Sequence, residues 1–194
     1  LEAEGRYQLA MEEYADSLEE SPDVPEIRIR YASLLADMGM PERAVSLLEG
    51  RDDLDWYGHR VLALAFSRVA TQKQEALPEA AEALRDVLQE RPDDPTVQLA
   101  LAQVVHRLGR VDEAEAIISD LRDRHGGSPQ LVLYHASLLR SQGRIEEAAD
   151  VYRTCVDGPA TAVSCREGLI QVLTELGRRG AAGEAILGWA SDDD

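Results

Sequence analysis

The sequence predicts an all-α protein, a solenoid of about five and a half stacked helix-turn-helix repeats. One observation is a recurring glycine: Leu108–Ala114 and Gln142–Ala148 are near copies whose glycines lie 34 residues apart. A second is an alanine that follows each such glycine five residues later. A third is the apolar spacing of three, four and seven residues around them, which is typical of amphipathic helices.

The recurring glycine marks the turn of each hairpin, because glycine takes the left-handed conformation that reverses the chain at a helix end. The pattern places it at Gly5, Gly39, Gly109, Gly143 and Gly177. At the start of the chain it predicts the end of one helix at Glu4, a turn at Gly5 and a second helix from about Tyr7 to Glu20. One block has Lys73 in place of the glycine and two extra residues, which predicts a longer, looser turn over Gln72–Pro78.

The alanine column predicts close helix packing, since a small side chain lets two helices approach and a large one a turn later fills the gap. The alanines are Ala10, Ala44, Ala80, Ala114, Ala148 and Ala182. The large residues four positions on are Tyr14, Leu48, Leu84, Ile118, Tyr152 and Ile186. Three prolines are expected to open first helices, where a missing N–H costs nothing: Pro25, Pro95 and Pro129.

These columns divide the chain into blocks of about 34 residues that together form one array over residues 1–194. A single hairpin cannot cover its own apolar face, whereas a stack of hairpins covers all but the ends. The predicted blocks are a partial repeat 1–24, then 25–58, the degenerate 59–94, 95–128, 129–162 and the C-terminal 163–194.

The pattern resembles the tetratricopeptide repeat family over the whole chain. The resemblance implies a right-handed superhelical α-solenoid whose first helices line a concave surface on which ligands dock. The family's aromatic near the start of each first helix is replaced by Arg28, Leu62, Gln98, Val132 and Arg166. The family's small residue in the middle of the first helix is kept at three places but lost at Phe66 and Ile170, where we expect wider packing.

Composition argues against several function classes. The net charge is −17, from 37 acidic and 20 basic residues, so the surface repels nucleic acid and anionic membranes. No apolar run is long enough to span a bilayer. The sequence has none of the histidine and cysteine spacings that are typical of metal sites. It also has no glycine-rich phosphate loop and no nucleophile-elbow motif. We therefore expect no cofactor, no metal and no catalysis. Paired acids such as Glu146 and Glu147 are interpreted as solvated helix faces, and His135 as a hydrogen-bonded interior or edge residue.

Cys155 and Cys165 lie in packing columns on opposite sides of the loop 157–162. The geometry permits a disulfide, which would indicate an oxidising compartment. Our preferred interpretation is two buried thiols that pack as small apolar residues.

Carried over residue by residue, the family's concave surface has an apolar floor flanked by hydroxyls, amides and a few basic groups. Its candidate residues are Ile29, Ser33, Arg60, Ser67, Leu99, Gln103, His106, Arg107, Leu133, Ser137, Arg140 and Gln171. We expect a peptide there, with a carboxylate held by Arg107 or Arg140. The alternative is that these arginines balance acids within the array. The Lys and Asn of the family's chaperone-tail clamp are replaced by Ile29, Ser33 and Ser67, so binding to chaperone C-termini is not expected.

The function that follows is a non-catalytic protein-interaction module, with a role as scaffold or in assembly, and with a protein or peptide as partner. The alternative is the recognition arm of a larger enzyme or of a thioredoxin-type redox co-chaperone, since residues 59–110 are similar to the repeats of thioredoxin-fused bacterial co-chaperones. A cytoplasmic location is favoured. The chain opens inside a repeat, so the missing signal peptide is uninformative, and the oligomeric state stays open.

Overall fold

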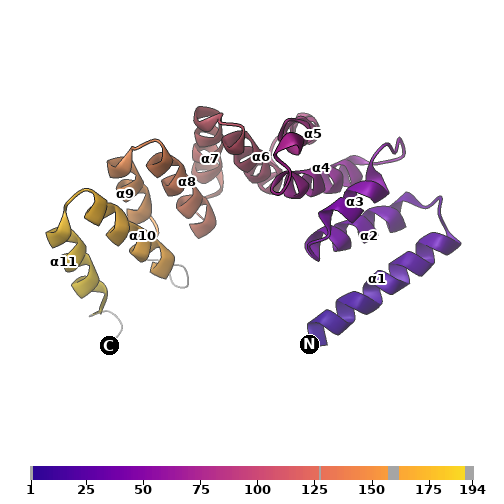
Figure 1. Cartoon of the computed structure of the whole chain (residues 1–194), viewed down its shortest axis with the longest axis horizontal. Coiled ribbons are helices and arrows are strands. Elements are labelled where there is room, and N and C mark those ends of the chain that lie inside the picture. Colours follow the sequence, from indigo (N-terminus) through magenta and orange to yellow (C-terminus); the bar gives the residue numbers. More distant parts are fainter. Residues whose placement is uncertain (1, 127, 157–161, 191–194) are drawn as a thin grey trace. The chain divides into compact units, whose positions relative to one another are not determined.

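The structure, a computed structural model, describes residues 2–126, 128–156 and 162–190, and every regular element in these ranges is helical (Figure 1). The chain divides into two compact units: Leu1–Arg110, called unit 1, and Val111–Asp194, called unit 2. Unit 1 contains α1 (Glu2–Glu20), α2 (Pro25–Asp37), α3 (Pro41–Leu48), α4 (Trp56–Ala70), η1 (Gln74–Ala76), α5 (Leu77–Glu90) and α6 (Pro95–Arg107). Unit 2 contains α7 (Val111–His125), α8 (Pro129–Ser141), α9 (Ile145–Arg153), α10 (Ala162–Glu175) and α11 (Arg179–Ala190).

Consecutive helices pack against one another within each unit, which is the arrangement expected of stacked hairpins. The predicted all-α fold class is therefore confirmed. The block boundaries and the single array over the whole chain stay predictions. Among the described residues, no helix combines the length and the hydropathy that are needed to cross a bilayer.

The hairpin turns have the predicted backbone conformation. Four of the recurring glycines have φ angles between 71° and 79°: Gly39, Gly109, Gly143 and Gly177. The residue after each glycine donates its N–H to a carbonyl five residues back, as Arg110 does to Val105 at 2.9 Å. This bond satisfies a carbonyl that the end of the helix would otherwise leave unpaired.

Two turn predictions need correction. No turn occurs at Gly5, because α1 runs without a break from Glu2 to Glu20. Within this continuous helix the backbone around Gly5 keeps its helical hydrogen bonding, so no carbonyl there has to be satisfied by a turn. The insertion after Lys73 is not loose either: it forms the short helix η1, which leads directly into α5 with Leu77 buried at the junction.

The alanine column lies at the helix interfaces, as predicted. The buried alanines of this column are Ala44, Ala80, Ala114, Ala148 and Ala182. The large residues that follow them are also buried at Leu48, Leu84, Ile118 and Tyr152. The side chain of Ile186 lies outside the described residues.

Polar residues that replace the family's aromatic fasten the preceding loop. Arg28 is only 2% exposed and also pairs with Asp53 at 3.1 Å. Each of these side chains donates a hydrogen bond to a carbonyl of the loop before its helix. Arg28 donates to Pro22, Gln98 to Pro92 at 2.6 Å, and Arg166 to Val156 at 3.2 Å. These hydrogen bonds take over part of the role that apolar contact has in the family's pattern.

Cys155 and Cys165 form a disulfide, so the preferred interpretation of two free thiols is wrong. Their Cα atoms lie 5.9 Å apart, inside the range that a disulfide requires. The two packing columns face each other where α9 packs against α10, and this brings the sulfurs together. The bridge joins the end of one hairpin to the start of the next.

Candidate functional site

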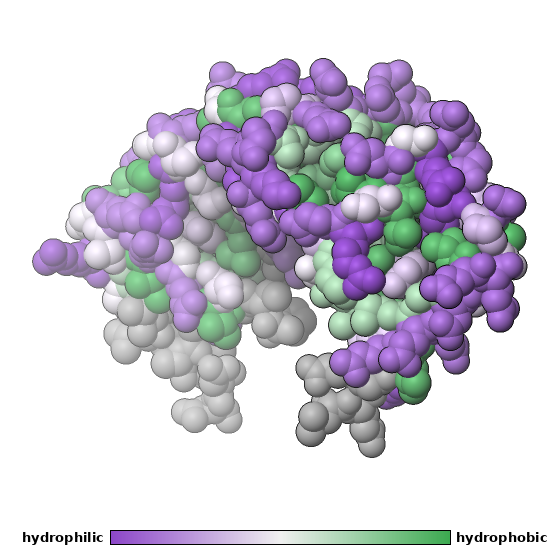
Figure 2. All heavy atoms as spheres, turned by 45° about the vertical axis from the view of Figure 1, so that its right-hand side comes forward, coloured by the Kyte–Doolittle hydropathy of each residue, from purple (hydrophilic) through white to green (hydrophobic). Residues whose placement is uncertain are grey.

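Unit 1 has a continuous depression over α1, α2, α4 and the start of α6. It consists of two adjoining hollows of about 420 Å³ and about 250 Å³. Both hollows are lined by Ser33, Asp37 and Tyr57, so they form one surface, which we call the unit 1 trough. With the N-terminal part of the chain turned forward, Figure 2 shows hydrophobic atoms between hydrophilic side chains that cover most of the visible surface.

Two ion pairs border the trough. Arg68 contacts Asp37 at 3.3 Å, and both side chains are largely exposed, so this pair contributes little to stability. Arg60 donates from Nε to Asp94 Oδ2 at 2.6 Å, and this pair is mostly shielded from solvent. The guanidinium of Arg60 is therefore held in one place at the edge of the trough.

Asp94 is fixed because it also caps α6. Its Oδ1 accepts hydrogen bonds from the N–H groups of Thr96 and Val97, both at 3.0 Å. Burial alone would raise the pKa of Asp94, but the hydrogen bond from Arg60, those from the helix N–H groups and the Arg60 charge together lower it. The carboxylate therefore stays ionised and bound to Arg60 at neutral pH.

The structure places the predicted unit 1 residues unevenly. Ser33 and Arg60 line the trough. Ile29 does not belong to any open floor, since it is only 5% exposed and packs against Gly58 and Leu54. The remaining candidates of unit 1 are half-buried or exposed: Ser67, Leu99, Gln103, His106 and Arg107.

In unit 2 the candidate residues lie on α8 and α10. Leu133 is partly buried against the core, while Ser137 and Gln171 are exposed. Arg140 donates to Gln171 at 3.2 Å and to Glu175 at 2.5 Å, so it joins the two first helices. These contacts show that neighbouring first helices in unit 2 share one face.

The basic residues expected to hold a carboxylate are already engaged within the protein. Arg107 donates to the carbonyl of Ala70, the last residue of α4, at 2.6 Å. Arg140 is paired with Glu175. The two arginines also lie in different units. These contacts favour the alternative interpretation, in which arginines balance acceptors inside the array.

The residues of the trough that sequence reasoning missed include Tyr7, Arg30 and Tyr57. Tyr7 and Tyr57 are 47% and 41% exposed and line the larger hollow with Arg30. In the sequence an exposed tyrosine is indistinguishable from a buried one. The only available signal was that Tyr57 stands at the start of a first helix, where the family's concave surface begins.

Unit 2 has a cavity of its own, of about 650 Å³, at α7, α8 and α9. Charged residues make up a large part of its lining. Arg144 donates to Glu115 at 2.5 Å and to Glu147 at 2.6 Å, and these bonds lower the pKa of both carboxyls and raise that of the guanidinium. Glu147 is exposed, as expected of a solvated helix face, and it also forms an ion pair with Arg144.

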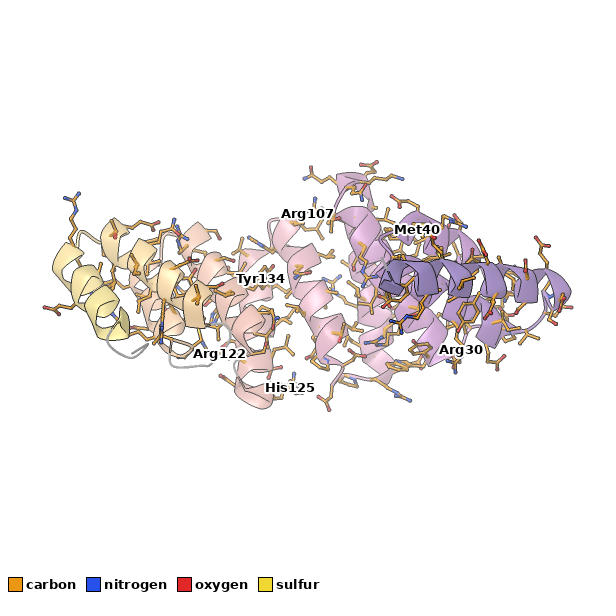
Figure 3. The ribbon with its side chains drawn as sticks, turned by 90° about the horizontal axis from the view of Figure 1, so that it is seen from below. Arg30, Met40, Arg107, Arg122, His125 and Tyr134 are labelled. Atoms are coloured by element: carbon orange, nitrogen blue, oxygen red, sulfur yellow. A yellow bond between two sulfur atoms is a disulfide. The ribbon has the colours of Figure 1, made fainter. Side chains whose placement is uncertain are left out.

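His135 lies at the wall of this cavity and is 5% exposed. Its Nδ1 is 3.1 Å from Nη1 of Arg122, a residue of α7 that is labelled in Figure 3. A guanidinium can only donate, so Nδ1 accepts and the ring proton resides on Nε2. Burial first, and then the charge of Arg122, lower the pKa of His135 against the opposing effect of Glu115. The prediction of a hydrogen-bonded interior histidine is confirmed.

A third cavity, of about 570 Å³, lies beside Trp56 at the start of α4. The guanidinium of Arg91 lies 4.0 Å from the centre of the indole ring, a cation–π contact. The indole Nε1 is buried and has no hydrogen-bond partner among the described residues. Within the described ranges, no group of three His, Cys, Asp or Glu side chains could hold a metal ion.

Comparison with known proteins identifies the repeat. The family model for the tetratricopeptide repeat matches residues 1–54 and 72–138. The unmatched segment between them contains α4, the first helix of the degenerate block. No curated protein matches the chain.

Solved structures share the fold at low sequence identity. TTC0263, a thermophilic TPR protein of Thermus thermophilus, is 24% identical, with a TM-score of 0.66 over 90% of this chain and 94% of that one. MamA of Desulfovibrio magneticus RS-1 is 12% identical, with a TM-score of 0.71 over 86% and 93% of the two chains. MamA of AMB-1 is 19% identical, with a TM-score of 0.67 over 83% and 94%.

Proposed function

Since the chain belongs to the tetratricopeptide repeat family, we propose that it holds a segment of a partner protein on its first helices and has no catalysis of its own. Repeats of this family serve as protein-interaction scaffolds. The partner segment would lie on α2, α4 and α6 of unit 1. A role in assembly, or as the recognition arm of a larger enzyme or thioredoxin-type co-chaperone, stays a prediction.

The observation that carries this proposal is the unit 1 trough. It runs across α1, α2 and α4 to the start of α6, and its wall contains two predicted residues, Ser33 and Arg60. Exposed aromatic and arginine side chains around a concave surface are typical of the parts of interfaces that contribute most to binding. A continuous surface of this kind suits an extended or helical peptide.

Photocrosslinking tests the location. A photoreactive benzoylphenylalanine is introduced at Ser33, in the trough, and in a control protein at Glu82, an exposed residue of the second helix α5. In an extract of the cells that make the protein, we expect adducts with a discrete set of proteins from Ser33 and none of these from Glu82. The same adducts from both positions, or from Glu82 alone, would contradict the proposal.

The structure also changes how the predicted arginines are tested. Reversing the charge of Arg140 would remove its bonds to Gln171 and Glu175 along with any bond to a partner. The double variant Glu175→Gln with Arg140→Gln separates the two effects, because it removes the internal pair as a whole. If Arg140 holds a carboxylate of the partner, binding falls in the double variant but not in Glu175→Gln.

The disulfide bears on the compartment. Disulfides persist in oxidising compartments and are rare in the cytosol. The bond between Cys155 and Cys165 therefore favours an oxidising compartment over the cytoplasm that was expected from sequence. Mass spectrometry after alkylation without a reductant tests this: no alkylated cysteine is expected in protein from its native cells, and two alkylated cysteines would refute it.

A further inference from the structure

The larger hollow of the unit 1 trough is lined in part by exposed aromatic and basic side chains. Tyr7 from α1 and Tyr57 from α4 belong to the small set of large apolar side chains that are exposed in the described residues. Both line this one hollow, which has a volume of about 420 Å³. Neither phenol group forms a hydrogen bond with the described part of the chain. Burying such surface against a partner would be favourable, because tyrosine offers a large contact area at a low entropic cost.

Arg30, labelled in Figure 3, extends from α2 and lines the same hollow. Most arginines in the described ranges form ion pairs or bonds to carbonyls, but Arg30 is exposed and has no hydrogen-bond or ion-pair partner there. Arg6 from α1 is a second cationic wall residue. A guanidinium that lines the same hollow as two exposed rings suits a carboxylate that is accompanied by an apolar side chain.

The hollow also has groups that can fix the backbone of a guest. Ser33 and Asp37 lie on the wall that it shares with the smaller hollow. Asp37 is already bound to Arg68, so it repels a second carboxylate less than a free acid would. The cationic side of the wall is therefore formed by residues of α1 and α2, and Asp37 lies where the two hollows meet.

We propose that this hollow, Tyr7–Arg30–Tyr57, is a binding site for an acidic peptide segment in which an aspartate or glutamate stands beside an aromatic or aliphatic side chain. The carboxylate is bound by Arg30, and the apolar side chain packs between the two tyrosines. This assignment rests on the proposed function, since it names the chemistry of the segment bound there. It differs from the site expected from sequence, which centred on Arg107 and Arg140.

The test is a titration of the full chain with two capped hexapeptides, followed by backbone amide shifts in nuclear magnetic resonance spectra. One peptide carries a phenylalanine followed by two aspartates, and its twin has asparagines in place of the aspartates. Physiological ionic strength screens the overall negative charge beyond a Debye length of about 8 Å and leaves contact pairs largely intact. We expect the acidic peptide to shift the amides of Tyr7, Arg30 and Tyr57. The asparagine twin should bind roughly tenfold more weakly, since a charge-assisted hydrogen bond is lost.

Matched variants separate the site from the overall charge. Arg30→Gln should weaken binding of the acidic peptide roughly tenfold. Arg51→Gln removes the same charge from an exposed position of unit 1 outside the trough, and should bind like the parent protein. Tyr57→Ala should weaken both peptides alike. Circular dichroism checks that each variant keeps its helical content.

Three results would overturn the assignment: equal binding of both peptides, equal effects of Arg30→Gln and Arg51→Gln, or no shift at the three residues. Sedimentation equilibrium tests whether a second copy of the chain occupies the hollow instead. This would be shown by a dimer that stays intact when the peptide is added but dissociates in the Arg30→Gln variant. If the crosslinks from position 33 persist in the Arg30→Gln variant, this assignment is wrong, although the proposed function is still supported. Absence of those crosslinks in the parent protein would count against the proposed function itself.

Discussion

Gly168 on α10 lets the helix approach α9 closely, and replacing it by alanine measures how tight that contact is. A Cβ at this position would lie under 3.0 Å from three ring carbons of Tyr152. Tyr152 is buried in the core of unit 2, where packed neighbours hold its ring in place. Either the ring or the helix must therefore move. Overpacking of this kind costs about 1–3 kcal/mol.

Two effects of Gly168→Ala oppose each other. Alanine favours the helix over glycine by up to about 1 kcal/mol. Subtracting this gain leaves a net loss of up to about 2 kcal/mol in the free energy of unfolding. With a denaturant slope of about 2 kcal/mol per molar, the urea midpoint should fall by up to about 1 M.

Gly183→Ala on α11 is the matched control, because a Cβ there meets no described atom within 4 Å. It receives only the helix gain, so its stability should rise by up to about 1 kcal/mol. Urea unfolding of both variants, followed by far-ultraviolet circular dichroism without a reductant, compares the same chemical change in two environments. If Gly168→Ala proved as stable as Gly183→Ala, the close packing of Tyr152 on α10 would be refuted.

Two further predictions concern unit 2. Replacing Cys155 and Cys165 by alanine opens a loop with a sequence separation of 10. Loop-closure entropy predicts a loss of about 3 kcal/mol in the free energy of unfolding. A urea midpoint equal to that of the oxidised parent would contradict this. The pKa of His135 is lowered in the folded state, so folding favours the neutral ring. The stability that this gives is fully present above the unfolded pKa of about 6.5. It is lost as the pH falls from about 6.5 toward the lowered pKa of the folded state. His135→Gln should lack this acid-dependent loss in urea unfolding measured across that pH window, and an unchanged pH dependence in the variant would disprove the role of the ring.

The repeat pattern predicts the fold because its signals are local. A glycine with positive φ closes a helix through its own neighbours in sequence, so Gly109 and Gly143 could be placed without any tertiary information. The same reasoning failed at Gly5, which lies inside the continuous helix α1. A recurring glycine therefore permits a turn but does not by itself require one.

The candidate site was less predictable because it depends on which partner each side chain finds. Arg107 and Arg140 stand on the expected helices, but acceptors from neighbouring helices bind them. Ile29 lies in the expected column, but the start of the next first helix covers it. Arg30 has the same chemistry as these arginines but finds no partner within the part of the chain that the structure describes. Such differences arise from contacts between residues that lie far apart in sequence, which no local pattern encodes.

The sequence by itself determined the helical hairpins, their glycine turns and their alanine interfaces, because these follow from backbone conformation and side-chain size within about 34 residues. Tertiary structure decided the disulfide, the pairing of the arginines and the position of the trough. Whether a cysteine meets a cysteine, or an arginine an acid, depends on distances across packed helices. Periodicity sets which face a residue occupies, and only packing sets what lies opposite that face.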